Sequence, residues 1–210
     1  MKTLTSFLKG EWVSGQGHAA VLHNATTEEP VASASTHGLD MEGALRYARE
    51  VGGPALRKLT FTERGVMLKK LADAISAHRA ELLLLGILNA GNTRSDAKFD
   101  VDGASATFAF YAELCKSLGD ARFFVDGEAI PLGRSSRLSG QHILTPRLGV
   151  AIHINAFNFP AWGLAEKAAT AIAAGMPFIA KPATSTALLA HRLFEVMVAS
   201  GALPDGVGQL

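Results

Sequence analysis

The sequence predicts an α/β protein in which a parallel β-α-β-α unit is combined with a helical layer and a β-hairpin. Three observations predict this fold class. Short apolar runs alternate with helical segments near the C-terminus, long helical periodicities precede Gly119, and apolar and polar side chains alternate between turn signals after it. We accordingly divide the chain into a first part with short strands and helices (1–121), a hairpin segment (122–150) and a β-α-β-α core (151–210).

The first part opens with strand-like pieces around residues 6–13 and 19–23, separated by a turn at Gly15 and Gly17. Short apolar runs and glycine turns of this kind are typical of small β elements.

Three helices are expected to follow. The first, "LDMEGALRYAREV", has Asp40 as a candidate N-cap and is expected to end at Gly52-Gly53. The second begins with Thr60 and Glu63 in capping-box spacing and closes near Gly91.

The third helix covers about residues 95–118 and stops before Gly119. One face is apolar at a period of 3.6 residues and consists of Phe108, Tyr111, Cys115 and Leu118. These helices predict a layer that packs on another element.

From Arg122 to Ile154, alternating side chains between turn residues favour a hairpin or small meander. The chain then reads as a buried strand, "GVAIHI", a helix that begins at Pro160, a second strand, "PFIAKPA", and a second helix that ends at Gly201. This β-α-β-α order implies parallel strands with crossover helices.

Composition narrows the classes of function. The chain is 48% hydrophobic and 19% charged with a net charge of +1, and it has no basic run, so neither nucleic acid nor a membrane surface is an expected partner. Cys115 is the single cysteine, the start lacks an apolar secretory segment, and the longest apolar run (82–88) is too short to span a bilayer. We expect a cytoplasmic protein with a small-molecule partner and no metal site.

Two asparagines interrupt the apolar C-terminal core. Asn155 and Asn158 lie between the carboxyl end of the first strand and the start of a helix. Open α/β sheets bind ligands in the crevice at the carboxyl ends of their strands. An amide there can donate to an oxygen that gains negative charge during a reaction. Lys181, at the end of the next strand, faces the same crevice as a donor to ribose or phosphate.

Plainer interpretations remain open at this point. Asn158 could be a turn residue that satisfies its own backbone, and Lys181 could be a solvated residue before Pro182. His153 fits a satisfied core histidine better than a base. Cys115, among Phe and Leu in a helix, fits a structural thiol.

The stretch "GVAIHINAFNFPAWGLAEKAATAIAAGMPFIAKPAT" resembles the aldehyde dehydrogenase family, in which a strand, a PWNFP-like turn, a helix and a K-P strand end follow in this order. The resemblance extends to "FLKGEWVSG", "LNAGNTRSDAKFDVDGASATFAFYAE" and "LPDGVGQL", the last as the start of a further strand. "NAFNFP" and "KPAT" are closer to the semialdehyde dehydrogenases of aerobic benzoate and phenylacetate degradation through coenzyme A thioesters. The fold implied is the N-terminal part of a Rossmann-like cofactor domain, with residues 122–150 as the oligomerisation hairpin.

The resemblance also implies roles for residues. Asn158 matches the family's oxyanion asparagine, which binds the aldehyde oxygen as a cysteine thiolate attacks, and Lys167 matches a helix lysine whose role we leave open. The segment whose backbone lines the nicotinamide ribose consists of Ile154, Asn155, Ala156 and Phe157. The residues implied at the adenosine ribose are Lys181, Ala183 and Thr184.

Thr184 bears on the choice of cofactor. NAD-preferring members of the family commonly have glutamate there, which repels a 2′-phosphate, so the resemblance implies NADP as the cofactor, with NAD possible. The threonine could instead cap the helix that follows, and the two roles are compatible. The implied substrate is an aldehyde carried as a coenzyme A thioester, and the implied assembly is a homodimer joined through 122–150.

The sequence departs from the family pattern in two places. Ala156-Phe157 stand where the wider family has Pro-Trp. The family's catalytic cysteine, general-base glutamate and glycine-rich nicotinamide loop fall after Leu210. We therefore expect residues 1–210 to be the N-terminal portion of an aldehyde dehydrogenase and to be inactive alone. The alternative is a nucleotide-binding or oligomer-interface module without chemistry.

Overall fold

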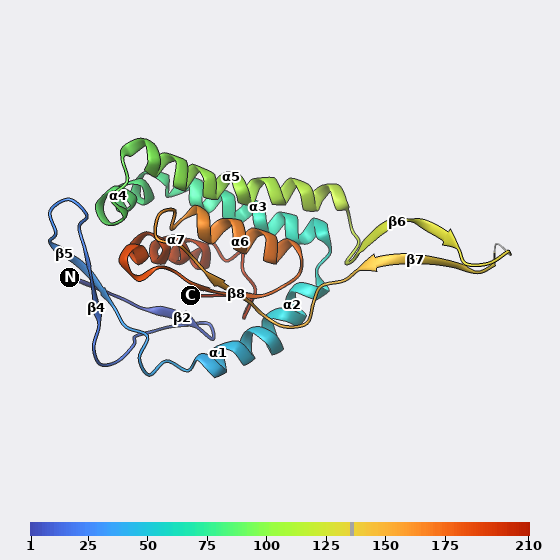
Figure 1. The fold of residues 1–210 in the computed structure, drawn as a ribbon, viewed down its shortest axis with the longest axis horizontal. Coiled ribbons are helices and arrows are strands. Elements are labelled where there is room, and N and C mark those ends of the chain that lie inside the picture. Colours follow the sequence, from blue (N-terminus) through green and yellow to red (C-terminus); the bar gives the residue numbers. More distant parts are fainter. Residues whose placement is uncertain (135–136) are drawn as a thin grey trace.

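The computed structural model describes residues 1–134 and 137–210, which form a layered α/β body with one projecting hairpin (Figure 1). In Figure 1, the helices α3, α4 and α5 lie along one side, α6 and α7 lie beneath them, and the short strands and α1 lie on the opposite side. The α/β fold class is confirmed.

The C-terminal sheet has the order β10-β9-β8 and is parallel throughout. Its strands are β8 (Ala151–Ile154), β9 (Phe178–Lys181) and β10 (Gly208–Gln209), and its helices are α6 (Trp162–Ala173) and α7 (Ala187–Ala199), the latter preceded by a 3-10 turn (Thr184–Thr186). Residue Ile154 of β8 is in register with Lys181 of β9, so the two strand ends that sequence reasoning singled out lie side by side. The predicted β-α-β-α order and the further strand are confirmed.

Strand β8 is only partly buried, which corrects the expectation of a buried strand. Ile152 is 55% exposed and Ile154 is 73% exposed, whereas His153 between them faces the interior. The strand lies at the edge of this sheet, and its Ile152 side chain lines a hollow together with Ile179 of β9.

The helical layer consists of α1 (Met41–Tyr47), α2 (Gly53–Lys58), α3 (Phe61–Ala77), α4 (Arg79–Ala90) and α5 (Arg94–Leu118). Asp40 caps α1, Thr60 and Glu63 form the predicted capping box of α3, and Gly91 ends α4 in the left-handed conformation. The long helix α5 ends before Gly119 as expected and packs along α3 and against α6.

Two helix boundaries were predicted wrongly. The first helix does not end at Gly52-Gly53 but continues through a π-helical turn (Ala48–Gly52) into α2. Gly52 serves close approach, since a Cβ atom there would lie 2.1 Å from the carbonyl oxygen of Gly206. The predicted helix from Thr60 to Gly91 is two helices, because His78 leaves helical geometry between α3 and α4.

The N-terminal strands are more numerous than predicted. Strands β1 (Lys2–Leu4), β5 (Pro30–Ala34) and β4 (Ala20–His23) form one sheet in the order β1-β5-β4. The predicted 6–13 piece is a hairpin of β2 (Ser6–Leu8) and β3 (Glu11–Val13), which turns at Lys9 and Gly10, both with positive φ. Sequence reasoning missed β1 and β5, because β1 is very short and β5 is rich in alanine and serine rather than β-branched residues.

The predicted hairpin is confirmed as β6 (Phe124–Pro131) and β7 (Ser139–Leu144), which pair in antiparallel fashion. It extends away from the body in Figure 1, and its residues are exposed except for the half-buried Gly140.

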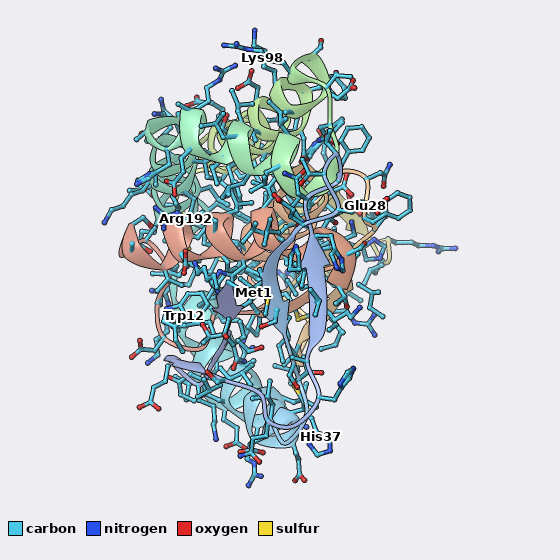
Figure 2. All side chains as sticks on the ribbon, turned by 90° about the vertical axis from the view of Figure 1, so that its left-hand side faces the viewer. Met1, Trp12, Glu28, His37, Lys98 and Arg192 are labelled. Atoms are coloured by element: carbon cyan, nitrogen blue, oxygen red, sulfur yellow. The ribbon has the colours of Figure 1, made fainter. Side chains whose placement is uncertain are left out.

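The largest core cluster lies where α3, α5, α6 and α7 meet the C-terminal sheet. Fully buried members include Leu68, Leu71, Phe108, Leu164, Phe178 and Phe194. Figure 2 shows side chains filling this interior, with Lys98 on the helical layer and His37 at the opposite end of the view. Within the described residues, no helix has both the length and the apolar character needed to cross a membrane.

Candidate active site

The turn between β8 and α6 is tied to its neighbours through its backbone. The Asn155 N–H donates to the Lys181 carbonyl (3.1 Å), which extends the pairing of β8 with β9. The Thr186 hydroxyl donates to the Phe157 carbonyl (2.8 Å), which joins the turn to the start of α7. The turn is therefore fixed by two elements that follow it in the chain.

Asn158 lies in this turn with an exposed side chain. No hydrogen bond from its amide to its own turn is found in the part of the chain that the structure describes, so the amide N–H groups are available to a ligand oxygen. Ile154, Ala156 and Phe157 are exposed along with it, so the structure brings four of the predicted site residues to one surface segment.

Asn155 behaves differently from Asn158. It is 6% exposed, and neither its amide nitrogen nor its amide oxygen has a hydrogen-bond partner among the described residues. A buried amide without partners is costly, so this side chain belongs to the interior of the turn rather than to its exposed surface. Its predicted role rests on its backbone, which is compatible with that burial.

Lys181 and Thr184 line a hollow of about 400 Å³ that is bordered by the C-terminal sheet, the N-terminal strands and residues of α1 and α7. The apolar wall includes Ile152 and Ile179, and no carboxylate is among the described lining residues. A cation, a hydroxyl and an apolar wall without acidic groups fit a phosphorylated ribose and its base. Neither the 3-10 turn nor α7 receives a side-chain cap, so the Thr184 hydroxyl is not used as one.

His153 and Cys115 are both buried groups. The His153 ring stacks on Phe178 with 5.3 Å between centroids, and burial, with a smaller effect of Lys167, lowers the pKa of His153 to about 4. Its Nδ1 has no partner among the described residues, so it is a neutral core histidine but not a fully satisfied one. Cys115 is fully buried in α5, and burial raises the pKa of its thiol, which opposes a nucleophilic role.

Lys167 lies on α6, one turn after Gly163. Its ammonium donates to the Gly163 carbonyl (3.0 Å) and pairs with Glu166 (2.8 Å), beside a shallow groove between α5 and α6. These contacts are within its own helix.

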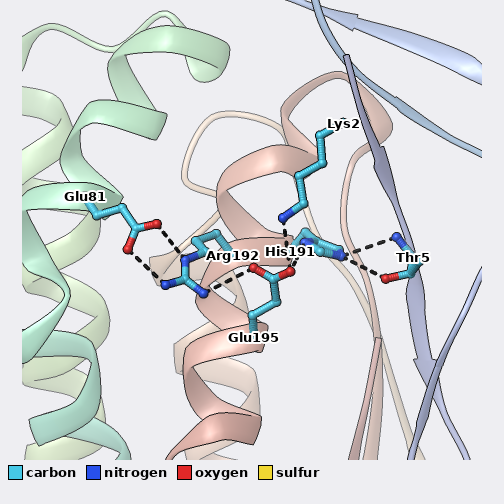
Figure 3. A network of polar contacts seen from close by, with 6 residues as sticks. All are labelled: Lys2, Thr5, Glu81, His191, Arg192 and Glu195. Atoms are coloured by element: carbon cyan, nitrogen blue, oxygen red, sulfur yellow. Dashed lines mark hydrogen bonds and ion pairs between the residues drawn. The ribbon is translucent and has the colours of Figure 1, made fainter.

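Helix α7, which follows Lys181 and Thr184, is braced by a polar network (Figure 3). The Arg192 guanidinium forms a two-pronged pair with Glu81 of α4 at 2.7 and 3.0 Å. Glu195 pairs with Lys2 (3.0 Å) and Arg192 (3.3 Å), and the Thr5 N–H donates to Nε2 of His191 (3.3 Å). Burial lowers the pKa of His191, so a neutral ring accepts this bond and ties α7 to the N-terminal strands.

Sequence reasoning missed Asp100, which belongs to this region. It is fully buried on α5 and accepts hydrogen bonds from the Trp162 N–H (2.7 Å) and the Ala161 N–H (3.3 Å) at the start of α6. Burial raises the pKa of Asp100 to about 6, although these two bonds oppose the rise. A signal was present in the sequence, since the helix after Pro160 begins without a capping side chain.

Comparison with known proteins gives a consistent picture. A model of the aldehyde dehydrogenase family matches residues 12–210. The chain is 45% identical over 203 residues to 3,4-dehydroadipyl-CoA semialdehyde dehydrogenase of Aromatoleum evansii, covering 97% of this chain and 39% of that protein. It is 28% identical over 203 residues to succinate-semialdehyde dehydrogenase (NADP(+)) GabD of Escherichia coli (strain K12), covering 96% of this chain and 40% of that one.

Among solved structures, a betaine aldehyde dehydrogenase point mutant from Staphylococcus aureus in complex with NAD+ superimposes with a TM-score of 0.85 at 27% identity. The match covers 100% of this chain and 41% of that one. The chain thus spans about two fifths of the length of these relatives.

Proposed function

This chain belongs to the aldehyde dehydrogenase family, and on that premise we propose that the protein oxidises an aldehyde to a carboxylic acid with NADP. The proposed substrate is a semialdehyde carried as a coenzyme A thioester, such as 3,4-dehydroadipyl-CoA semialdehyde. The 45% identity to an enzyme of that name supports this choice. Because the chain spans about two fifths of its relatives, the activity is proposed for the protein encoded by the complete reading frame.

The observation that carries the proposal is the exposed, unengaged amide of Asn158 beside the paired ends of β8 and β9. In the proposed reaction this amide donates to the aldehyde oxygen, where negative charge develops when a nucleophile adds to the carbonyl carbon. The backbone bonds of Asn155 and Phe157 hold the turn in place, so the donor needs little reorganisation during the reaction.

NADP, when bound, supplies the acceptor for the hydride that leaves the aldehyde carbon. Lys181 would pair with the 2′-phosphate, and the Thr184 hydroxyl would donate to a phosphate oxygen. The absence of a carboxylate among the described residues of this hollow removes the repulsion that would exclude a phosphate. NAD lacks that phosphate and would gain less from Lys181.

Asn158 provides the test of the reaction. In the complete protein, Asn158→Ala and the isosteric Asn158→Asp both remove the N–H donor, and we expect kcat to fall by roughly 10²–10³. NADP affinity and thermal stability should change little, since the side chain is exposed. Turnover of the thioester semialdehyde at the wild-type rate by either variant would contradict the oxyanion role.

Cofactor preference is tested at Thr184. We expect a higher kcat/KM with NADP than with NAD. Thr184→Glu should reverse or abolish this preference, because it places a carboxylate near the 2′-phosphate of NADP. Ser185→Glu, one position along the same turn, is the matched control. A wild-type protein that prefers NAD would refute the NADP assignment while leaving the reaction class intact.

We also propose that the protein is a homodimer joined through the β6–β7 hairpin. This hairpin and its loop expose the large apolar side chains of Phe124, Val125, Ile130, Leu132, Leu138, Ile143 and Leu144. A projecting surface of this kind is typical of an association site. Light scattering should show that Ile143→Asp weakens the dimer and that Val66→Asp, on an exposed face of α3, does not.

A further inference from the structure

Helix α6 begins without a cap of its own. Ala161 occupies its N-cap position and provides no side-chain cap, and the first turn of α6 contains no acidic residue. The first N–H groups of a helix need acceptors, and an uncapped start in a protein interior is costly.

Asp100 supplies the missing acceptors from a different helix. One carboxylate oxygen accepts from the Trp162 N–H at 2.7 Å, and the other accepts from the Ala161 N–H at 3.3 Å. Asp100 is fully buried, so water does not compete for these bonds. A carboxylate at a helix N-terminus is also favoured by the helix dipole.

The rest of α5 contacts α6 closely enough to fix this geometry. A Cβ atom added at Gly103 would lie 3.1 Å from the Trp162 ring, and the Trp162 Nε1–H donates to the Thr107 hydroxyl at 3.0 Å. The start of α6 therefore cannot move along α5 without losing several contacts at once.

Asn158 lies between two anchored points of the backbone. On one side, the Phe157 carbonyl is held by Thr186. On the other side, three residues after Asn158, the bonds to Asp100 begin. The Asn158 side chain itself contacts neither anchor through a hydrogen bond in the described chain, so its place is set by the backbone on both sides.

We propose that Asp100 is a positioning residue for Asn158: by capping α6 from α5, its carboxylate fixes the turn that carries the oxyanion donor. This inference rests on the proposed function. Asp100 does not touch the substrate; it acts through the backbone of Ala161 and Trp162.

The substitution Asp100→Asn tests this role with little change in volume. An asparagine offers one acceptor oxygen where the aspartate offers two, so one of the two backbone N–H groups would face an NH₂ group. The start of α6 should shift to relieve this contact. Asp102→Asn is the matched control, because Asp102 lies two residues along α5 and pairs with Arg79 instead of α6.

In the complete protein, we expect Asp100→Asn to lower kcat roughly tenfold, since small misplacements of a catalytic group are costly. KM for NADP should stay within about twofold of wild type, because Lys181 and Thr184 lie on another element and residues 154–157 keep their bonds to Lys181 and Thr186. In an Asn158→Ala background, Asp100→Asn should cause no further loss of kcat, because the group it positions is already gone. Asp102→Asn should leave kcat unchanged.

A second readout does not depend on activity. The emission of Trp162 is obtained as the difference between the spectra of matched proteins with and without Trp162→Phe, and Asp100→Asn should shift this difference spectrum while Asp102→Asn should not.

The outcomes separate the two proposals. If Asn158→Ala lowers kcat but Asp100→Asn leaves it within about twofold of wild type, the positioning role is refuted and the oxyanion role stands. Equal fold losses from Asp100→Asn with and without Asn158 would also refute it, since that pattern indicates a general structural role. If the wild type oxidises no aldehyde, the proposed function fails, and an unshifted Trp162 emission would then refute the anchoring of α6 as well.

Discussion

Helices α3 and α6 begin in opposite ways. The first turn of α3 caps itself, since the Thr60 hydroxyl accepts from the Glu63 N–H (3.2 Å) and the Glu63 carboxylate accepts from the Thr60 N–H (2.7 Å). The first turn of α6 is capped by Asp100, which lies 61 residues before Ala161. The start of α3 is thus capped by residues of its own first turn, whereas the start of α6, next to the candidate site, is capped by a residue of α5.

The other end of α6 shows the same dependence. Its last turn contains no basic residue, and the Ala173 carbonyl instead accepts from the Arg64 guanidinium of α3 at 2.5 Å. Arg64 is fully buried and also donates to the Arg122 carbonyl (3.3 Å) at the base of the hairpin. A negative group at the start of α6 and a positive group at its end both match its dipole. Helix α5 also has a local cap, since the Thr93 side chain accepts from the Asp96 N–H. The two self-capped helices α3 and α5 therefore hold α6 between them.

The largest expected effect comes from removing the support at the end of α6. Arg64→Met keeps an apolar stem of similar length but removes the donor to the Ala173 and Arg122 carbonyls. Hydrogen bonds to a charged group contribute about 1.5–3 kcal/mol each, so we expect the free energy of unfolding to fall by about 3–5 kcal/mol in chemical denaturation. Arg46→Met, at an exposed pair with Glu42, is the control and should cost less than about 0.5 kcal/mol.

If Arg64→Met proved as stable as wild type, the burial cost of the guanidinium would equal what its bonds contribute. The end of α6 would then need no help from α3, and the comparison between the two helices would fail at that end.

The next effect is a dependence on pH that distinguishes a buried cap from an exposed one. The pKa of Asp100 is raised to about 6 from an ordinary 3.8, chiefly by burial. Since the folded value lies above the unfolded one, the stability contributed by this group is complete below the unfolded pKa and is lost as pH rises through the folded pKa. The stability advantage of wild type over Asp100→Asn should fall by about 3 kcal/mol over that window.

Asp40, the local cap of α1, gives the opposite sign. A hydrogen bond from Lys9 and one from the Gly43 N–H lower the pKa of its exposed carboxyl. Its contribution is present above the unfolded pKa and is lost as pH falls through the folded pKa. Denaturation of both Asp→Asn variants over this pH range checks the contrast, and two slopes of the same sign would remove it.

The same contrast explains what the sequence could reveal. Asp40, Thr60 and Gly91 were predicted correctly because each acts on residues within one turn of itself. The paired ends of β8 and β9 followed from the order of elements alone. Asp100 was missed because its partners are far along the chain, and an acidic residue in a helix ordinarily indicates a solvated face.

The wrong prediction at Gly52 has a similar cause. Gly52 suggested a helix end, yet its role is to admit the Gly206 carbonyl, a contact that only the folded chain creates. The hairpin was readable because its alternation is local, whereas the burial of Asn155 depends on the elements packed around the turn. Local signals therefore gave the scaffold, and contacts between distant residues set the candidate site.

The smallest expected effect tests whether the self-capped start of α3 is independent of α6. Thr60→Ala removes one acceptor from the capping box and should lower the free energy of unfolding by about 1 kcal/mol, while Ser117→Ala, an exposed hydroxyl late in α5, should stay within about 0.5 kcal/mol. Combined with Asp100→Asn, the two costs should add to within about 0.5 kcal/mol, because Thr60 and Asp100 share no hydrogen-bond partner. The costs of Thr60→Ala and Arg64→Met should not add. The side-chain Nε–H and the backbone N–H of Arg64 both donate to the Thr60 carbonyl, so fraying of this turn also loosens the Arg64 side chain. If Thr60→Ala were instead additive with Arg64→Met and coupled to Asp100→Asn, the expectation would be wrong. The start of α3 would then depend on the cap of α6 and not on Arg64.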